Sequence, residues 1–540
     1  MLDSIKNALG IGKVPEAPTN PRPKPVAKTK TPVPPPKEFD VADLFSGPAG
    51  AVQPAEAGAT GLDEKLRQAY FWIINHAVIS PFYDIAYEET PPSQYKLGDS
   101  HCPIVLPTGQ SYSSFVLLPL LTLALRRKCL LIGGPGRGKT QTAILMGILS
   151  GYSLKEVRRG IQHGQPQMTI ADLLGNPLPA DLVGAKSMDE ITIAWRKWLG
   201  MRVKIIDEYN RIPTRTQSAL LTLMADNYAE ILDQVFECPE SAWYLTANDD
   251  AGGGTYQVIE ALRDRIDVVV RALHFNTRFL GDLLVRIEQK VKPEDIVPPQ
   301  IIFTETELDA MQKQILKVRL PIPLRRRLEF FAAQFEFLEG GASMLEYRTK
   351  DNAACSGGDV KMLLNQETGK DRVREIGMQS VNGLSVRALM TAMAFMKGMA
   401  FFHGEEEVSL EDMRQMLPFV LHDKLRPNLD ARFFEEPGNA ALRFDRIGWI
   451  RRLFDQACAE YDRLNLDQDD PVAVLQHELD QGLDGVSEKE VHSRVARIEQ
   501  ILNTYQRGKK FYAHLYDDVL SLKYMYQRYT NYLRWLLTRS

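Results

Sequence analysis

The sequence predicts an α/β domain built on a parallel sheet, followed by a region that is almost entirely helical. From about residue 115 to 270, apolar runs of strand length alternate with helical patterns, which implies a parallel sheet covered by helices on both faces. Beyond residue 275 the strand signals fade and amphipathic helical periodicity dominates to the C-terminus. The expected strands are Cys129–Ile132, Val203–Ile206, Trp243–Ala247 and Asp267–Val270.

The composition is that of an ordinary globular protein with several domains. The chain has 540 residues, 44% apolar and 25% charged, which excludes a mostly disordered, collagen-like or disulfide-scaffold protein. Its net charge of −4 provides no global basic field, so nucleic-acid binding is not expected. Five cysteines lie far apart without metal spacing and indicate reduced thiols.

No segment has the pattern of a membrane span or a signal peptide. The longest apolar run, Phe115–Leu125, contains Pro119 and is too short to cross a bilayer. Near the N-terminus, Asp3 and Lys6 interrupt the apolar stretch that a signal peptide needs. A cytoplasmic protein is therefore expected.

Residues 1–60 are expected to form a disordered, proline-rich arm. Nine prolines between Pro15 and Pro36 favour extended polyproline II, and such a tract cannot bury a core. Two apolar islands, Met1–Leu9 and Phe39–Phe45, fit either a frayed terminus or docking peptides on a semi-rigid tether. Ordered sequence should begin near Gly61.

The strongest motif is GGPGRGKT, at residues 133–140. It satisfies GxxxxGK[ST] and lies between an apolar strand and a helical pattern, Thr142–Leu149. Its glycines let backbone N–H groups turn toward phosphates, Lys139 would contact the β- and γ-phosphates, and Thr140 would ligate Mg²⁺. The predicted nucleotide-binding residues are Gly133, Gly134, Pro135, Gly136, Arg137, Gly138, Lys139, Thr140 and Gln141.

A second segment agrees with a magnesium nucleotide. The buried-type strand Val203–Ile206 runs directly into Asp207 and Glu208, which is costly unless a cation or solvent meets the carboxylates. Alone, such a strand end is often an exposed turn. With the phosphate motif upstream, Asp207 is predicted to hold Mg²⁺ through water and Glu208 to polarise the attacking water. The glutamate favours hydrolysis over phosphoryl transfer to a substrate.

Two further sites follow later strands. The strand Trp243–Ala247 ends at Asn248, whose amide could reach between the γ-phosphate and the water, although a turn-forming Asn is the alternative. Arg263 and Arg265 precede a Val-rich strand, and an exposed arginine there could reach a neighbouring subunit's nucleotide.

Together these residues resemble the MoxR family of AAA+ ATPases over roughly residues 95–430. The resemblance is carried by Thr169–Gly175, Asp207–Pro213, Thr216–Leu221, Thr246–Asp249, Gly254–Tyr256, Glu260–Arg265, Gly383–Ala388, Val408–Asp412 and Val420–Leu425. It implies an AAA+ P-loop three-layer αβα domain with a parallel sheet, then an α-helical lid. It also makes Asn248 sensor 1, Arg265 the finger acting in trans with Arg263 as competitor, and Arg387 the sensor-2 arginine contacting the γ-phosphate.

The family implies partners as well. Its members assemble as hexameric rings, usually work beside a protein with a von Willebrand factor A domain, and act as chaperone-like remodellers. The expected function is therefore Mg²⁺-dependent ATP hydrolysis in a ring that remodels a partner protein. The alternatives are an ATP-switched assembly or signalling scaffold with little turnover, a nucleic-acid motor and a metal-chelatase motor subunit.

The predicted organisation is an arm (1–60), an AAA+ nucleotide-binding domain (61–275), a lid with an insertion near 340–381 (276–430) and a C-terminal helical domain (431–540). Breaks at Asn465–Pro471 and Gly482–Ser487 should divide the last domain into helices. Its end interleaves aromatic and basic residues, which suits a packed bundle, a protein-binding surface or single-stranded nucleic acid. The spacing of Tyr505, Tyr512, Tyr516 and Val519 favours a packed helical face.

Overall fold

A computed structural model gives the structure of residues 61–78, 82–99, 104–178, 191–248, 260–290, 292–366, 375–468, 470–508 and 511–539. The predicted arm of residues 1–60, with both apolar islands, lies outside these ranges. The strands are β1 (Ile85–Ala86), β2 (Ser93–Tyr95), β3 (Ile104–Leu106), β4 (Ser111–Tyr112), β5 (Lys128–Ile132), β6 (Gln162–His163), β7 (Gly175–Pro177), β8 (Ile193–Trp195), β9 (Val203–Asp207), β10 (Tyr228–Ile231), β11 (Gln234–Glu237), β12 (Ala242–Ala247) and β13 (Val268–Arg271).

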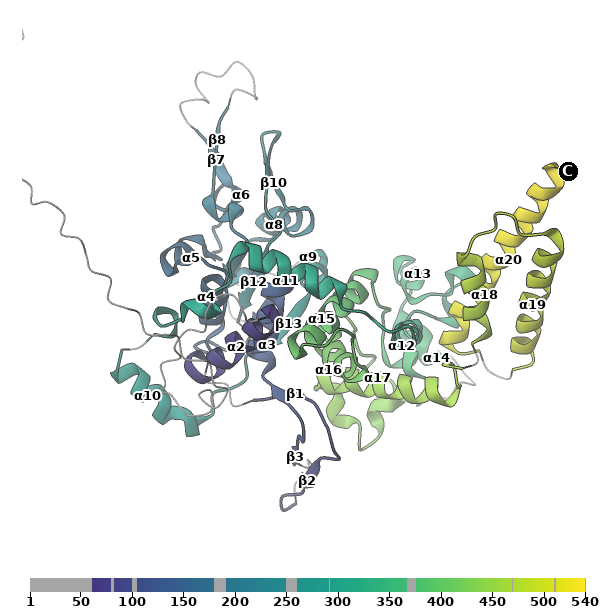
Figure 1. Cartoon of the computed structure of the whole chain (residues 1–540), viewed down its shortest axis with the longest axis horizontal. Coiled ribbons are helices and arrows are strands. Elements are labelled where there is room, and N and C mark those ends of the chain that lie inside the picture. Colours follow the sequence, from purple (N-terminus) through teal and green to yellow (C-terminus); the bar gives the residue numbers. More distant parts are fainter. Residues whose placement is uncertain are drawn as a thin grey trace, which may run out of the picture.

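The helices lie mainly between and after these strands (Figure 1). They are α2 (Leu62–Trp72), α3 (Ser114–Leu125), α4 (Lys139–Leu149), α5 (Leu154–Gly160), α6 (Ile170–Leu174), α8 (Thr214–Asp226), α9 (Glu260–Arg265), α10 (Leu280–Glu288), α11 (Glu305–Lys317), α12 (Ile322–Ala333), α13 (Lys350–Cys355), α14 (Val360–Gln366), α15 (Val386–His403), α16 (Leu410–Leu421), α17 (Arg446–Arg463), α18 (Pro471–Asp480), α19 (Glu488–Gln506) and α20 (Ala513–Arg539).

The central sheet has five parallel strands in the order β13-β5-β12-β9-β6. Four of them coincide, to within one residue at each end, with the strands expected from the sequence. The edge strand β6 has only two residues, and its sequence carries no strand pattern. The four longer strands are almost continuously apolar because helices cover both faces of the sheet.

Alternate residues of each strand enter two different cores, which is the signature of three layers. In β5, Cys129 and Leu131 pack in the core that contains α3 and α4, whereas Leu130 packs in the core that contains α6, α8 and α9. Every residue of α3 is buried. The three-layer αβα arrangement with a parallel sheet is thus confirmed, together with the helical region that follows it.

Short hairpins project from the α/β layers. The pairs β7–β8 and β10–β11 extend beyond α6 and α8 on one side, and β2–β3 extends in the opposite direction (Figure 1). Each is a two-stranded ribbon outside the central sheet.

The later helices form a lid and a terminal bundle. Helices α11, α12, α15, α16 and α17 share one continuous core with α3 and one face of the sheet. Helices α18, α19 and α20 have a separate core and form the far end of the molecule (Figure 1). The predicted domain boundaries at residues 275 and 430 remain predictions. Among the described residues, no helix is both long and apolar enough to cross a bilayer.

Candidate nucleotide site

The loop between β5 and α4 has the backbone of a phosphate cradle. Gly138 adopts φ 78° and starts α4, a left-handed conformation that suits glycine. At Gly133 a Cβ would lie 2.8 Å from the carbonyl oxygen of Ala272, so only glycine fits between β5 and the chain after β13. The loop therefore lies at the carboxyl edge of the sheet, beneath the N-terminus of α4, where backbone N–H groups favour an anion.

Lys139 is buried in this loop and is held by oxygen atoms. Its Nζ donates to the carbonyls of Gly133 and Gly134 at 2.6 and 2.8 Å and to Oδ1 of Asn248 at 3.0 Å. The ammonium group is thus poised at the loop, and phosphate oxygens would replace neutral acceptors with charged ones.

Asp207 lies at the end of β9, opposite the start of α4. Its Oδ1 accepts a hydrogen bond from Thr140 Oγ1 at 2.7 Å and another from Thr246 Oγ1 at 2.6 Å. Its other oxygen, Oδ2, lies 3.4 Å from Nδ1 of His163 on β6. The two residues predicted to hold Mg²⁺, Thr140 and Asp207, are therefore in direct contact.

Glu208 and Asn248 also meet. Nδ2 of Asn248 donates to Oε1 of Glu208 at 3.2 Å, and Arg211 pairs with the other carboxylate oxygen at 3.1 Å. The backbone of Glu208 is left-handed, with φ 54°, and its N–H donates to Thr246 Oγ1 at 3.0 Å. Asn248 thus links Lys139 to Glu208, so the predicted lysine, glutamate and sensor asparagine form one hydrogen-bonded chain.

Two adjoining cavities have the shapes and polarities that a nucleotide requires. A polar cavity of about 230 Å³ is lined by the loop together with Asp207, Glu208, Thr246 and Asn248. A larger, mainly apolar cavity of about 820 Å³ shares Gly136, Arg137, Gly138 and Gln141 with it. Phosphates suit the first cavity, and a base with its ribose suits the second.

The donor set fits Mg²⁺ only with help from phosphates. The described residues include no cluster of three His, Cys, Asp or Glu side chains that could hold a metal alone. Mg²⁺ typically takes one or two protein oxygens and completes its shell with water and substrate phosphates. Thr140 and Asp207 supply that number of oxygens beside the phosphate cradle.

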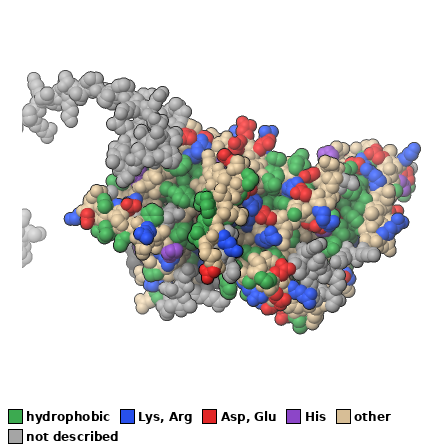
Figure 2. Space-filling view, turned by 90° about the horizontal axis from the view of Figure 1, so that it is seen from below, with side chains coloured by type: hydrophobic (Ala, Val, Ile, Leu, Met, Phe, Trp, Pro, Cys, Tyr) green, Lys and Arg blue, Asp and Glu red, His purple; other side chains and the backbone are tan. Residues whose placement is uncertain are grey.

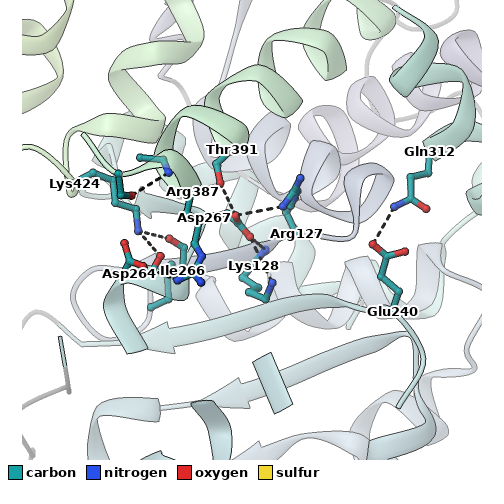
Figure 3. Close-up of polar contacts among 12 residues, drawn as sticks. Arg127, Lys128, Glu240, Asp264, Ile266, Asp267, Gln312, Arg387, Thr391 and Lys424 are labelled. Atoms are coloured by element: carbon teal, nitrogen blue, oxygen red, sulfur yellow. Dashed lines mark hydrogen bonds and ion pairs between the residues drawn. The ribbon is translucent and has the colours of Figure 1, made fainter. Parts of the chain in front are cut away.

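The three candidate arginines lie near the amino-terminal ends of β5 and β13, whereas the phosphate loop follows the carboxyl end of β5. Asp267 precedes β13, and its carboxylate accepts hydrogen bonds from the N–H of Lys128 and from Thr391 on α15 (Figure 3). One turn earlier on α15, Arg387 donates to Asp264 at 2.5 Å. Because the phosphate loop follows the other end of β5, about 15 Å of strand separates it from this cluster.

Arg263 and Arg265 belong to this amino-terminal edge of the sheet, which we call the arginine edge. Arg263 is exposed and pairs with Asp423 at 2.7 Å, whereas Arg265 is partly buried. Lys424 donates to the backbone carbonyls of residues 263, 264 and 266, so it caps the C-terminus of α9 (Figure 3). Burial lowers the pKa of Lys424.

Comparisons with known proteins agree with this geometry. Residues 128–268 match the ATPase family associated with various cellular activities (AAA), and residues 379–442 match the AAA lid domain. The chain is 23% identical over 316 residues to the chaperone MoxR1 of Mycobacterium tuberculosis (strain ATCC 25618 / H37Rv), covering 55% of this chain and 73% of that protein.

Residues 128–268 and 379–442 are therefore similar to an AAA ATPase domain and its lid, and the chain is similar to a MoxR chaperone. A solved structure from Cytophaga hutchinsonii ATCC 33406, of a protein assigned as an ATPase, is 18% identical with a TM-score of 0.43. The similarity covers 63% of this chain and 89% of the chain in the solved structure.

The candidate site also contains residues that the sequence did not single out. Thr246 joins Asp207 to the backbone of Glu208, Arg211 pairs with Glu208, and His163 lies beside Asp207. Thr246 and Arg211 lie inside segments that carry the family resemblance, so their positions in the sequence could have indicated that they belong to the site. His163 follows no recognisable pattern, because only the pairing of β6 with β9 brings it to Asp207.

Proposed function

We propose that the AAA+ module hydrolyses ATP with Mg²⁺ at a site completed by a second copy of the chain. The observation that carries this proposal is the convergence of Lys139, Thr140, Asp207, Glu208 and Asn248 on one polar cavity. Such a set suits hydrolysis because it combines a phosphate cradle, oxygen ligands for a divalent cation and a carboxylate near the phosphate end.

Each side chain then has a separate task. Lys139 and the loop amides would bind the β- and γ-phosphates, and Thr140 and Asp207 would hold Mg²⁺, which would supply positive charge against the phosphates. Glu208 accepts a proton from the attacking water, and Asn248 fixes the carboxylate that does so. When ATP binds, the bond between Lys139 and Asn248 is free to exchange, leaving the amide to orient water.

The arginine edge supports a shared site. Arg263 and Arg265 lie next to the start of β13, about 15 Å of strand away from their own phosphate loop, which supports a role for one of them at a neighbouring site. Arg387 on the lid stays the predicted sensor-2 arginine. A neighbouring copy whose arginine edge faces the loop would supply the positive charge of Arg263 or Arg265. A head-to-tail contact of this kind closes into a ring, which we propose to be hexameric.

Remodelling of a partner protein follows from the same proposal. The chaperone relative supports it, and the projecting hairpins β7–β8 and β10–β11 offer surfaces that a partner could contact. We propose a cytoplasmic ring working beside a von Willebrand factor A domain protein. On the face shown in Figure 2, acidic and basic side chains are interspersed, which provides no continuous basic track for a nucleic-acid motor.

The test is the ATPase rate per subunit across a range of protein concentrations. We expect the rate to rise with concentration, and both Glu208→Gln and Arg265→Ala to be inactive alone. Mixing them should restore activity, because Glu208→Gln copies keep their arginine edge and Arg265→Ala copies keep their glutamate. The same mixture with Arg263→Ala in place of Arg265→Ala identifies which of these two guanidinium groups acts in trans.

Three results would count against this proposal. A flat rate that does not depend on any of the arginines would exclude the shared site. Binding of ATP without turnover under all conditions, including added partner protein, would favour the assembly scaffold. A rate that depends on added nucleic acid would favour the motor.

A further inference from the structure

The terminal bundle carries a groove that the AAA+ site does not use. It lies between the end of α18, the loop that follows and the second half of α20, and has a volume of about 590 Å³. Three aromatic side chains of α20 line it, Tyr524, Tyr532 and Trp535. Asp480 and Asp484 line the opposite wall.

The aromatic wall is both exposed and ordered by contacts. The rings of Tyr532 and Trp535 stack with centroids 5.5 Å apart, and Tyr532 donates its hydroxyl to the carbonyl of Val486. Tyr524 is 53% exposed and Trp535 is 43% exposed, although large apolar rings are usually covered. The groove therefore presents flat rings to a ligand at little cost in conformational entropy.

Aromatic grooves of this kind suit proline. Proline-rich segments in polyproline II dock against exposed Tyr and Trp rings, because the extended helix is preformed and presents its rings in register. A basic residue at one end of such a segment pairs with carboxylates at the rim. Arg528 also lines the groove, so the attraction for a cation comes from Asp480 and Asp484 and not from a strongly negative field.

We propose that the groove holds the chain's own segment Pro32–Lys37. This segment reads PVPPPK, and from Pro18 to Lys37 the sequence contains five basic residues and no acidic one. Its prolines would pack against the aromatic rings of α20, and the positive charge of Lys37 would pair with the carboxylates of Asp480 and Asp484. The two features that the nucleotide site leaves unexplained, the proline-rich arm and the aromatic last helix, thus bind one another.

The chain is long enough for this contact. Gly61 starts α2, which is joined to α11 by the ion pair of Lys65 with Glu307. From Glu307, α11 and the following loop reach Ile322 within about 35 Å. Ile322 lines a cleft that shares Gln476 and Asp480 with the groove. The 24 residues from Lys37 to Gly61 span about 80 Å when extended, which leaves about 45 Å for the steps from Gly61 to Glu307 and from Ile322 across the cleft to the groove.

The test is site-specific photo-crosslinking in the full chain. We place p-benzoyl-L-phenylalanine at Val33, irradiate an equal mixture of nitrogen-15-labelled and unlabelled protein, and map crosslinks by mass spectrometry. The expected result is a crosslink between copies of the same label, landing within residues 476–484 or 524–535. Trp535→Ala should lower the yield about tenfold, as loss of a central aromatic anchor does.

Leu537→Ala is the matched control, because Leu537 is 65% exposed on the same helix and does not line the groove. It should leave the yield unchanged. A charge exchange covers the possibility that Trp535→Ala disturbs the bundle. Asp484→Lys and Lys37→Asp should each lower the yield, and the double variant should restore it.

Several results would overturn the proposal. Crosslinks that scatter over the surface, or that persist in Trp535→Ala, would show that the groove does not hold the segment. Crosslinks between heavy and light copies would assign the groove to a neighbour's arm. None of these outcomes depends on ATP turnover, so the proposed function is tested separately.

Discussion

At the scale of single residues, Thr246 shows how a neutral hydroxyl can organise a charged site. It donates to Asp207 and accepts from the backbone N–H of Glu208, so one side chain orients the carboxylate of Asp207 and the backbone of Glu208. Thr246 is 1% exposed, which means that water cannot replace these hydrogen bonds. Orientation of Asp207, the aspartate that we propose to hold Mg²⁺, therefore depends on a residue from the neighbouring strand.

Replacing Thr246 with Val should weaken the metal site without removing a ligand. The N–H of Glu208 loses its acceptor and Oδ1 of Asp207 keeps only the Thr140 bond, so we expect the Mg²⁺ concentration for half-maximal ATPase to rise about tenfold. Thr246→Ser is the control, because it keeps the hydroxyl and should stay near the wild-type value. Equal Mg²⁺ requirements in the Val and Ser variants would remove Thr246 from this role.

The sequence predicted the site where its chemistry is local. The phosphate loop and the pair Asp207-Glu208 are each a contiguous stretch of sequence, and the strand or helix beside each of them can be recognised from its own residues. The contacts of Thr246 and His163 depend on which strands are neighbours, and β6 is too short to be recognised. The edge on which Arg387 lies also depends on how α15 packs, which no local pattern specifies.

At the scale of elements, α3 and α15 illustrate close packing between the sheet layers and the lid. Gly398 on α15 faces α3, and a Cβ there would lie 3.2 Å from Cδ1 of Leu125 and 3.6 Å from Cδ2 of Leu121. The missing side chain lets the two helices approach. The apolar run Phe115–Leu125 was correctly excluded as a membrane span by its length and Pro119. It is a central core helix instead.

Gly398→Leu should therefore destabilise the protein by about 1–3 kcal/mol through overpacking. The measurement is urea unfolding followed by tryptophan fluorescence. Gly281→Leu on α10 is the matched control, because a Cβ at that position meets no atom within 4 Å and helix propensity improves. Similar shifts in both variants would mean that the α3–α15 contact does not limit stability.

Prediction was weaker for the ends of the last helices. Tyr505, Tyr512, Tyr516 and Val519 have helical spacing, yet α19 ends at Gln506 and α20 begins at Ala513. Tyr505 packs against the bundle core, whereas Tyr516 packs against Phe337. The periodicity correctly indicated packed residues, but it continued across a turn that lacks proline and has a single glycine.

At the scale of the whole molecule, the terminal bundle should respond to pH. Burial, together with the charge of Asp470, raises the pKa of Asp518 to about 6, and Tyr505 donates to this carboxyl at 3.1 Å. The folded carboxyl therefore binds its proton more tightly than the unfolded one. Its contribution to stability is present below about pH 4 and is lost as pH rises through 6.

Asn mimics the protonated acid, so Asp518→Asn should match wild type at pH 4 and be more stable at pH 7.5 by about 1–2 kcal/mol. Thermal unfolding of both proteins at the two pH values measures the difference. If the stability of Asp518→Asn relative to wild type is the same at pH 4 and pH 7.5, ionisation of Asp518 does not destabilise the folded protein.

The position of Lys424 has a consequence for timing in the proposed ring. This lysine ties the lid to the end of α9, so any swing of the lid moves Arg263 and Arg265 with it. In the proposed ring, one of those arginines serves the nucleotide site of the next copy and not its own. Hydrolysis in one copy would then change the site of the neighbouring copy first, and turnover would proceed sequentially around the ring. One inactive copy would interrupt this sequence, so the ring would lose more ATPase activity than the fraction contributed by that single copy.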